Sequence, residues 1–224
     1  MTTITLTSRE LTALVAPVLP HASMDVTIPT LMSILIRSTG PWVTAIATDR
    51  YRIGMQRLRP DTEPGDGFMA AIPLRALARI RSLFKATRYN DPVLTFTVDD
   101  GTIVVTAVDT LIGLTGASLS FDVVKDYPKI DRLMVEALNA PPVETASRAV
   151  INPALLADFA VGQPSHIPAH ITPTGPDNKP WMIRIGDDFI GLVVPIHGGS
   201  PLVDATTWLP LLTVAPTEPV AAAA

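Results

Sequence analysis

Residues 93–107, Val-Leu-Thr-Phe-Thr-Val-Asp-Asp-Gly-Thr-Ile-Val-Val-Thr-Ala, decide the fold class of this chain. Two runs rich in β-branched residues, Val93 to Val98 and Thr102 to Ala107, flank the turn residues Asp99-Asp100-Gly101. Short strands on either side of an Asp-Gly turn predict an antiparallel hairpin. Ala117 to Val124 predicts a further strand, so we expect an antiparallel sheet here.

A helix is predicted just before this hairpin. Pro73 is a favoured first-turn residue, and Leu74, Leu77, Ile80 and Phe84 follow it at helical spacing. The local order is therefore strand, helix and about three strands.

This order of elements is predicted three times, from Thr3 to Leu58, from Phe68 to Val124 and from Arg148 to Ile196. The three units share the pattern but no close sequence identity, so the repeat is one of architecture. A parallel sheet would need more helices than the chain offers. The order predicts an α+β fold in which antiparallel sheets are backed by helices.

Local signals place the other elements. The first helix is expected from Ser8, as N-cap, to about Leu19, and the third opens with Asn152 as N-cap and Pro153 at the first helical position. A turn is expected at Ser38–Pro41. The remaining strands are predicted at Leu31–Ile36, Trp42–Ala47, Arg52–Leu58, His170–Thr174, Trp181–Ile185 and Phe189–Val194.

Composition excludes several classes of protein. The chain has 224 residues, a formal net charge of −4, 47% hydrophobic and 17% charged residues, and no cysteine. The lack of cysteine excludes disulfides, thiolate metal sites and cysteine nucleophiles, and it fits a reducing cytoplasm. No apolar run reaches the roughly 18 residues that a membrane span needs. The N-terminus lacks a signal-peptide pattern, so we expect a cytoplasmic protein that does not contact membranes.

One segment is strongly basic although the whole chain is acidic. Between residues 75 and 88 there are five cations and no acid. Long cationic side chains on one helix can attract phosphates without reading bases, whereas a solvated basic helix face is the alternative interpretation. The candidate DNA-binding residues are Arg75, Arg79, Arg81, Lys85 and Arg88.

No enzyme motif is present, and we expect neither a catalytic residue nor a cofactor. His166 and His170 are four residues apart, but Pro168 disfavours the helix that would align them as metal ligands. The sequence has no nucleophile elbow, phosphate-binding glycine loop or dinucleotide fingerprint. Asp99-Asp100 and Asp187-Asp188 stand beside glycines and indicate turns.

Short motifs resemble those of the bacterial DNA polymerase III beta subunit, the sliding-clamp family. Residues 47–53, Ala-Thr-Asp-Arg-Tyr-Arg-Ile, are similar to its A-T-D-x-x-R-L turn, and residues 127–133, Tyr-Pro-Lys-Ile-Asp-Arg-Leu, to its F-P-D-Y-R-R-L segment. Residues 192–196, Leu-Val-Val-Pro-Ile, resemble its terminal V-V-M-P-M, and residues 28–31 match a segment before a strand. The resemblance covers roughly Thr3 to His197, and the compact size is compatible with a phage-encoded clamp.

This resemblance implies the DNA-clamp fold, in which repeated βαβββ units form antiparallel sheets outside and helices face inward. Residues 1–134 resemble the complete middle domain of the family, and residues 148–198 resemble the second half of its last domain. Residues 135–147 are expected to be a linker and residues 199–224 a tail. The family's dimeric ring holds twelve units, so three units per chain predict a homotetrameric ring. A trimer, with the linker contributing to a degenerate domain, is the alternative.

The resemblance also implies partners: duplex DNA of any sequence, a clamp loader, and a DNA polymerase that inserts a short peptide into an apolar groove. Four positions depart from the family. Arg50 replaces a small residue, Val194 and Ile196 replace methionines, and His197 stands where a terminal arginine is usual. The matching groove positions are Leu31, Thr48, Tyr51, Arg52, Ile53, Pro128, Arg132, Leu133, Leu192, Val194, Pro195 and Ile196.

The tail and the function leave alternatives open. Residues 207–212, Thr-Trp-Leu-Pro-Leu-Leu, could dock into the groove or pack on the outer sheet. The main hypothesis is a sliding clamp in a bacterial or phage-infected cell. The alternatives are a clamp mimic that binds a resident clamp or its partners without encircling DNA, and an α+β interaction protein whose motif matches are accidental.

Overall fold

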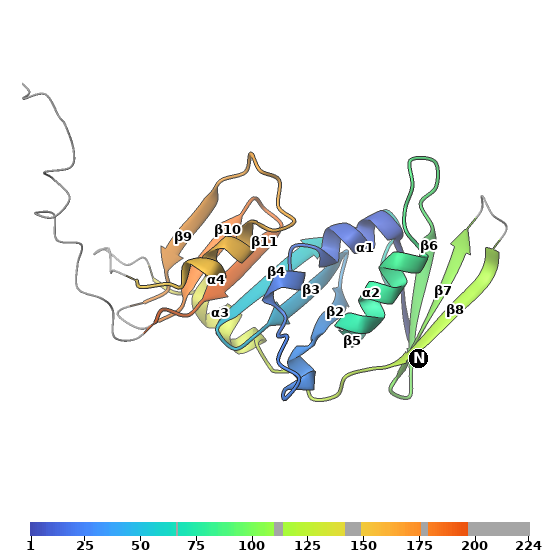
Figure 1. The fold of residues 1–224 in the computed structure, drawn as a ribbon, viewed down its shortest axis with the longest axis horizontal. Coiled ribbons are helices and arrows are strands. Elements are labelled where there is room, and N and C mark those ends of the chain that lie inside the picture. Colours follow the sequence, from blue (N-terminus) through green and yellow to red (C-terminus); the bar gives the residue numbers. More distant parts are fainter. Residues whose placement is uncertain (66, 110–113, 142–148, 176–178, 197–224) are drawn as a thin grey trace, which may run out of the picture.

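The computed structural model describes residues 1–65, 67–109, 114–141, 149–175 and 179–196. These residues form three units with a short helix between the second and the third (Figure 1). Unit 1 comprises β1 (Thr2–Thr7), α1 (Ser8–Val15), β2 (Ser33–Thr39), β3 (Trp42–Thr48) and β4 (Arg52–Leu58). Unit 2 comprises β5 (Met69–Pro73), α2 (Leu74–Leu83), β6 (Val93–Asp99), β7 (Thr102–Asp109) and β8 (Leu114–Asp122). After α3 (Asp131–Leu138), unit 3 comprises α4 (Pro153–Ala157), β9 (Ala169–Pro173), β10 (Trp181–Ile185) and β11 (Phe189–Val193).

Units 1 and 2 are interlocked because each gives its first strand to the other. Strand β1 pairs with β6 of unit 2, and β5 pairs with β2 of unit 1. The result is a four-stranded sheet in the order β1-β6-β7-β8 and a seven-stranded sheet in the order β5-β2-β3-β4-β11-β10-β9. Every pairing is antiparallel, as the sequence predicts.

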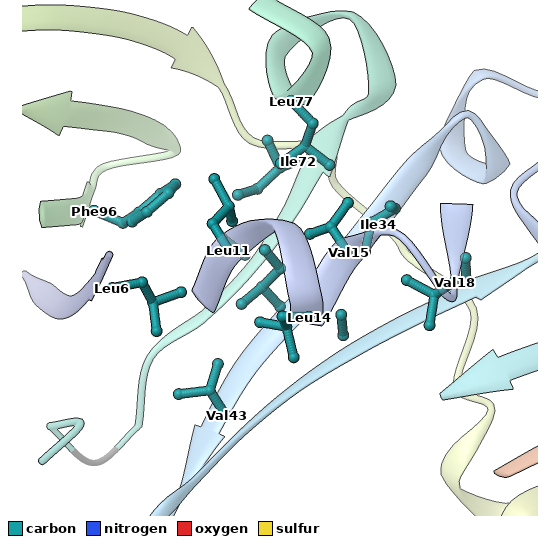
Figure 2. Packing of buried hydrophobic residues seen from close by; sticks show 14 of the residues in the cluster. Leu6, Leu11, Leu14, Val15, Val18, Ile34, Val43, Ile72, Leu77 and Phe96 are labelled. Atoms are coloured by element: carbon teal, nitrogen blue, oxygen red, sulfur yellow. The ribbon is translucent and has the colours of Figure 1, made fainter. Parts of the chain in front are cut away.

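The main core lies between the sheets and the helices α1 and α2, which lie beside each other on one side of the molecule (Figure 1). Leu11, Leu14 and Val15 of α1 are fully buried, and Figure 2 shows them between Leu6 of β1 and Ile34 of β2. Because their apolar residues recur at helical spacing, each helix presents one continuous stripe to the sheets. The polar faces of both helices are left on the same side of the protein.

A second, smaller core lies on the opposite face of the seven-stranded sheet. Helix α3 places Met134 and Ala137 against Leu35, Ile46 and their neighbours on that face. Alternation along β2 explains both cores, since Ile34 and Ile36 belong to the main core and Leu35 to the second. Ile130, the residue just before α3, belongs to the same cluster and also anchors the helix to the sheet.

The structure corrects several sequence-based expectations. Thr7, not Ser8, caps α1: its side chain accepts from Glu10 N at 3.2 Å, and the Glu10 carboxylate accepts from Thr7 N at 2.6 Å. This capping box fixes the start one residue earlier, and α1 ends at Val15, well before Leu19. The turn between β2 and β3 is shorter than expected and consists of residues 40 and 41.

Two further differences concern the connection to unit 3. The predicted linker 135–147 begins with helix, because α3 continues to Leu138. A strand was expected before α4, but residues 149–152 contain none among the described part of this unit. Packing of α3 on the sheet, a tertiary contact, outweighs the local proline signal that suggested a linker. No helix in the described ranges is long and apolar enough to cross a membrane.

Candidate functional site

An apolar groove opens where unit 1, unit 3 and the segment before α3 meet. Its cavity has a volume of about 380 Å³. The walls come from the segment before β2, the β3–β4 turn, the residues around the start of α3, and the end of β11. The lining residues are Ile28, Thr30, Leu31, Thr48, Arg50, Arg52, Ile53, Pro128, Ile130, Leu133, Pro180, Leu192 and Val194.

The β3–β4 turn is held by its own side chains. Asp49 Oδ1 accepts hydrogen bonds from Tyr51 N and Arg52 N, each at 3.0 Å. Thr48 Oγ1 donates to Arg52 O at 2.8 Å and accepts from Arg50 N at 3.2 Å. Arg50 has φ 81°, a conformation that non-glycine residues seldom adopt. This network therefore fixes one wall of the groove.

Arg52 is a buried cation that ties the groove to unit 3. Its guanidinium pairs with Asp49 at 3.0 Å and with Asp158, and Nη2 donates to Pro20 O at 2.7 Å. A fourth contact, in which Nη1 donates to Leu155 O, measures 3.3 Å. Asp158 of unit 3 thus helps to neutralise Arg52. The arginine shapes the wall and is not free to bind a ligand's charge.

Beside Arg52 lies His21, fully buried and in ring contact with Phe159 at 4.4 Å between centroids. Neither ring nitrogen has a hydrogen-bond partner. Burial, and then the positive charge of Arg52, lower the pKa of His21 to about 3. The imidazole is therefore neutral near pH 7 and packs as an apolar ring.

The segment leading into α3 forms the opposite wall. Tyr127 Oη donates to Ile46 O at 3.0 Å, and burial raises the pKa of this phenol. Arg37 pairs with Asp131 at 2.7 Å, and the hydrogen bond from Arg37 lowers the pKa of the Asp131 carboxyl. Both contacts hold Pro128 and Leu133 over the sheet, where they line the cavity.

The structure brings most of the sequence-predicted groove residues together, but not all. Arg132 points away, with its side chain 87% exposed and paired with Glu136 at 2.7 Å. Tyr51 lines a neighbouring depression beside Asp25. Pro195 is buried and Ile196 half exposed, and neither lines the cavity. The residues that the prediction placed at the site and that do line the cavity are Leu31, Thr48, Arg52, Ile53, Pro128, Leu133, Leu192 and Val194.

Sequence reasoning missed five lining residues. Ile28 and Thr30 belong to a quoted motif and could have been carried over from it. Arg50 was noted only as a departure from the family turn. Ile130 also belongs to a quoted motif, residues 127–133, and could likewise have been carried over. Pro180 lines the groove through tertiary packing, for which the sequence offers no local signal. The terminal run 207–212 and His197 lie outside the described residues.

The basic residues of unit 2 lie on the side of the molecule that carries α1 and α2. Arg75, Arg79, Lys85 and Arg88 are exposed, and Arg81 is half-buried. Within the described ranges, none of these five side chains has a carboxylate oxygen within 4.0 Å. No ion pair within the described part of the chain therefore neutralises their charge.

The expectation that all five stand on one helix is wrong. Helix α2 ends at Leu83, so Lys85 and Arg88 lie in the following loop. Thr87 Oγ1 accepts from Asn90 N at 3.1 Å and Tyr89 N at 3.3 Å, and this local turn competes with further helix. Arg81 and Lys85 nevertheless face the same hollow between α1 and α2 as Arg9, together with small residues such as Ala13 and Ala78.

The described residues contain no cluster of three or more metal-ligating side chains. His166 precedes β9 and His170 lies within it, and neither forms an ion pair with an acidic side chain among the described residues.

Comparisons with known proteins identify the fold. No protein-family model and no curated protein sequence matches the chain. Among solved structures, it is similar to the DNA polymerase sliding clamp from Pseudomonas aeruginosa, with 13% identity and a TM-score of 0.65, over 88% of this chain and 67% of that one. It is also similar to the DNA polymerase III beta subunit from Thermotoga maritima (12%, 0.68, 89% and 66%) and to the beta subunit from Streptococcus pyogenes (16%, 0.65, 88% and 66%). The chain thus has the sliding-clamp fold and spans about two thirds of the length of these clamps.

Proposed function

We propose that this chain is a DNA sliding clamp, a non-enzymatic processivity factor that encircles duplex DNA as a ring of several copies. The observation that carries the proposal is the unpaired basic surface of unit 2, on the helix side of a chain with the clamp fold. In such a ring the helix side faces the DNA. Cations without carboxylate partners attract phosphates of any sequence and keep contacts loose enough to slide.

Topological retention on DNA tests this proposal. The protein is allowed to assemble in the presence of nicked circular plasmid, and the complex is then passed through gel filtration at high salt. We expect protein to remain with circular DNA and to be lost once the plasmid is linearised, because a ring slides off free ends. Equal loss from circular and linear DNA would exclude encirclement.

We further propose that the apolar groove takes a short peptide of DNA polymerase, and that a clamp loader and other replication proteins use it too. Support comes from its rigid turn, its apolar lining and its size, which suits a few anchoring side chains. Leu133 lines it and is 49% exposed, so Leu133→Asp should remove peptide binding without unfolding the chain. Arg132→Ala, at a neighbour that does not line the cavity, is the matched control. Peptides selected from a display library supply the probe for fluorescence polarisation.

The tail remains a separate proposal. A chain ending at residue 198 should bind such peptides more tightly if residues 207–212 occupy the groove. Unchanged affinity would favour packing of this run elsewhere.

A clamp mimic is the second candidate, favoured by the chain's span of only two thirds of known clamps. A mimic would bind a resident clamp or its partners and would not close a ring by itself. The solution mass of the purified chain separates the two, because a monomer across the micromolar range fits only the mimic.

A further inference from the structure

Units 1 and 2 contact each other in a reciprocal way. The first strand of unit 1 pairs with the strand after the helix of unit 2, from Thr2↔Val98 to Thr7↔Val93. The first strand of unit 2 pairs with the strand after the helix of unit 1, from Ser33↔Pro73 to Arg37↔Met69. Reciprocal contacts are the mark of a two-fold relation. Within this chain, a complete pair of units is therefore a two-fold arrangement.

Unit 3 joins unit 1 in a second, different way. Its last strand β11 pairs with β4, the last strand of unit 1, with Gly191 opposite Gly54 and Val193 opposite Arg52. Here the last strands of two units pair with each other. The described strands therefore follow two pairing rules. The strand that follows a helix pairs with the first strand of another unit, and the last strand of a unit pairs with the last strand of another unit.

Among the described residues, two strands lack the neighbour that these rules assign. Strand β8 is the last strand of unit 2, and β9 is the strand after the helix of unit 3. Both are edge strands, and they lie at opposite ends of the molecule (Figure 1). The other two edge strands, β1 and β5, are covered by neighbouring segments within the pair formed by units 1 and 2. Val124 N donates to Ala71 O of β5, and a Cβ at Gly65, just before β5, would lie 3.2 Å from Thr3 O of β1.

The surface around β9 exposes apolar side chains that a second, paired unit would bury. In unit 1, Ile34 and Ile36 of β2 are fully buried, but Ile171 of β9 is 41% exposed. Helix α4 buries no residue, unlike α1 and α2, and Leu156 on it is 36% exposed. Beneath lies a cavity of about 190 Å³, lined by both residues and by Gln163. The Gln163 amide nitrogen is buried without a hydrogen-bond partner.

The edge at β8 is open to pairing as well. Ser118 and Ser120 are exposed on one face, and Leu119 and Phe121 are half-buried on the other. Edge strands that avoid association usually carry lysine or proline, and residues 117–121 carry neither. An added strand would cover the two half-buried side chains.

We infer that each end of the molecule binds the same end of a second copy: unit 3 pairs with unit 3, and β8 pairs with β8. Both contacts are isologous. The inference rests on the proposed ring and specifies its assembly. Copies joined alternately through two isologous contacts close only in even numbers, so three copies are excluded and three units per chain give twelve units in four copies. A head-to-tail ring would instead join β8 to β9, a last strand to a strand that follows a helix, and no two of the described strands pair in this way.

Light scattering on variants of each end tests this assembly. The double variant Ser118→Lys with Ser120→Lys places lysines of two copies opposite each other at the β8 contact, where they repel. The double variant Leu156→Lys with Ile171→Lys does the same at the contact between two copies of unit 3. The wild-type chain should be a tetramer, each double variant a dimer held by the other contact, and the combined variant a monomer. Thr62→Lys with Glu63→Lys, both at exposed loop positions, should remain a tetramer. Thermal unfolding confirms that each variant is folded.

Other masses separate the inference from the proposed function. A wild-type trimer, or a monomer from either double variant, would mean head-to-tail contacts and would overturn the inference while leaving a ring. Unchanged tetramers in both variants would show that the contacts lie elsewhere. A wild-type monomer would exclude both the proposed ring and the inference.

Disulfide trapping gives an independent readout because the chain has no cysteine. A two-fold axis at the β8 contact places identical residues of two copies opposite each other. Of the variants Ser118→Cys, Leu119→Cys and Ser120→Cys, each tested alone, at least one should therefore give a covalent dimer on oxidation. In a head-to-tail ring no single cysteine on β8 would crosslink, whereas Ser120→Cys with Thr172→Cys on β9 would link copies into chains.

Discussion

At the scale of single residues, Arg52 shows how one side chain joins two parts of the fold. It is 8% exposed and pairs with Asp49 and Asp158, which come from unit 1 and unit 3. Removing one partner of a buried ion pair leaves the other charge without compensation. We expect Arg52→Met to lower the free energy of unfolding by roughly 3 kcal/mol, measured by urea denaturation. Asp158→Asn, at a 39% exposed position, should cost clearly less, and equal losses would argue against the pairing.

His21 gives the protein a predictable sensitivity to acid. Its pKa is lowered to about 3 in the folded state, from 6.5. Between these values the unfolded chain binds a proton that the folded chain does not, so stability falls as the pH falls from 6.5 towards 3. The slope is at most about 1.4 kcal/mol per pH unit.

The control for this prediction is His21→Leu, which keeps an apolar group against Phe159. Its free energy of unfolding should fall less steeply with acid than that of the wild type. Parallel curves for the two proteins over this pH range would show that His21 does not carry the effect.

At this scale the sequence predicts the groove well and its edges poorly. The motif residues Thr48, Arg52 and Leu192 line the cavity because local turns and strand ends place them there. Arg132 fails because the rotation of α3 on the sheet turns it outward while Leu133 turns inward. That rotation depends on tertiary packing of Met134 and Ala137, which the motif alone does not encode.

At the scale of elements, strands bounded by turn residues could be predicted closely. The expected bounds of β4 and β10 agree with the structure. Helix ends were harder to predict: α1 stops at Val15, two residues before the helix-weakening Pro17, whereas α2 stops at Leu83 ahead of the local turn at Thr87, with neither glycine nor proline at its end. The whole of α3 was missed, since its stability derives from the outer face of the seven-stranded sheet.

The β4–β11 junction depends on two facing glycines. A Cβ at Gly191 would lie 2.3 Å from Phe159 Cε1 and 2.7 Å from the backbone oxygen of Ile53. Backbone cannot yield as a flexible side chain can, so Gly191→Ala should destabilise the protein by about 1–3 kcal/mol. Hydrogen exchange should show the loss concentrated in unit 3. Gly175→Ala, which meets only the flexible Lys179 side chain, is the matched control and should be near neutral.

At the scale of the whole molecule, net charge is a poor guide to partners. The chain carries a formal charge of −4, yet cations that have no carboxylate partner among the described residues gather on the helix side of unit 2. We expect DNA affinity to fall steeply with salt, with a slope of about −0.9 in log–log terms for each phosphate contact. Arg75→Gln, Arg79→Gln and Arg81→Gln together should flatten this slope without changing the solution mass. An unchanged slope would place the DNA contacts elsewhere.

The number of units could be predicted from the order of elements, but the way copies join could not. Counting units left a tetramer and a trimer open. Only the pairing of β1 with β6, β5 with β2, and β4 with β11 shows which strand takes which neighbour. Those pairings join residues far apart in sequence, and no local pattern specifies them.

The two isologous contacts inferred between copies have one more consequence. A ring closed by two kinds of isologous contact has two-fold axes lying in its own plane, and each axis turns the ring over onto itself. Its front and back are then the same surface, with two of the four apolar grooves opening on each. Such a clamp would have no polarity on DNA, because a polymerase would meet the same binding surface in either orientation of the ring on the duplex.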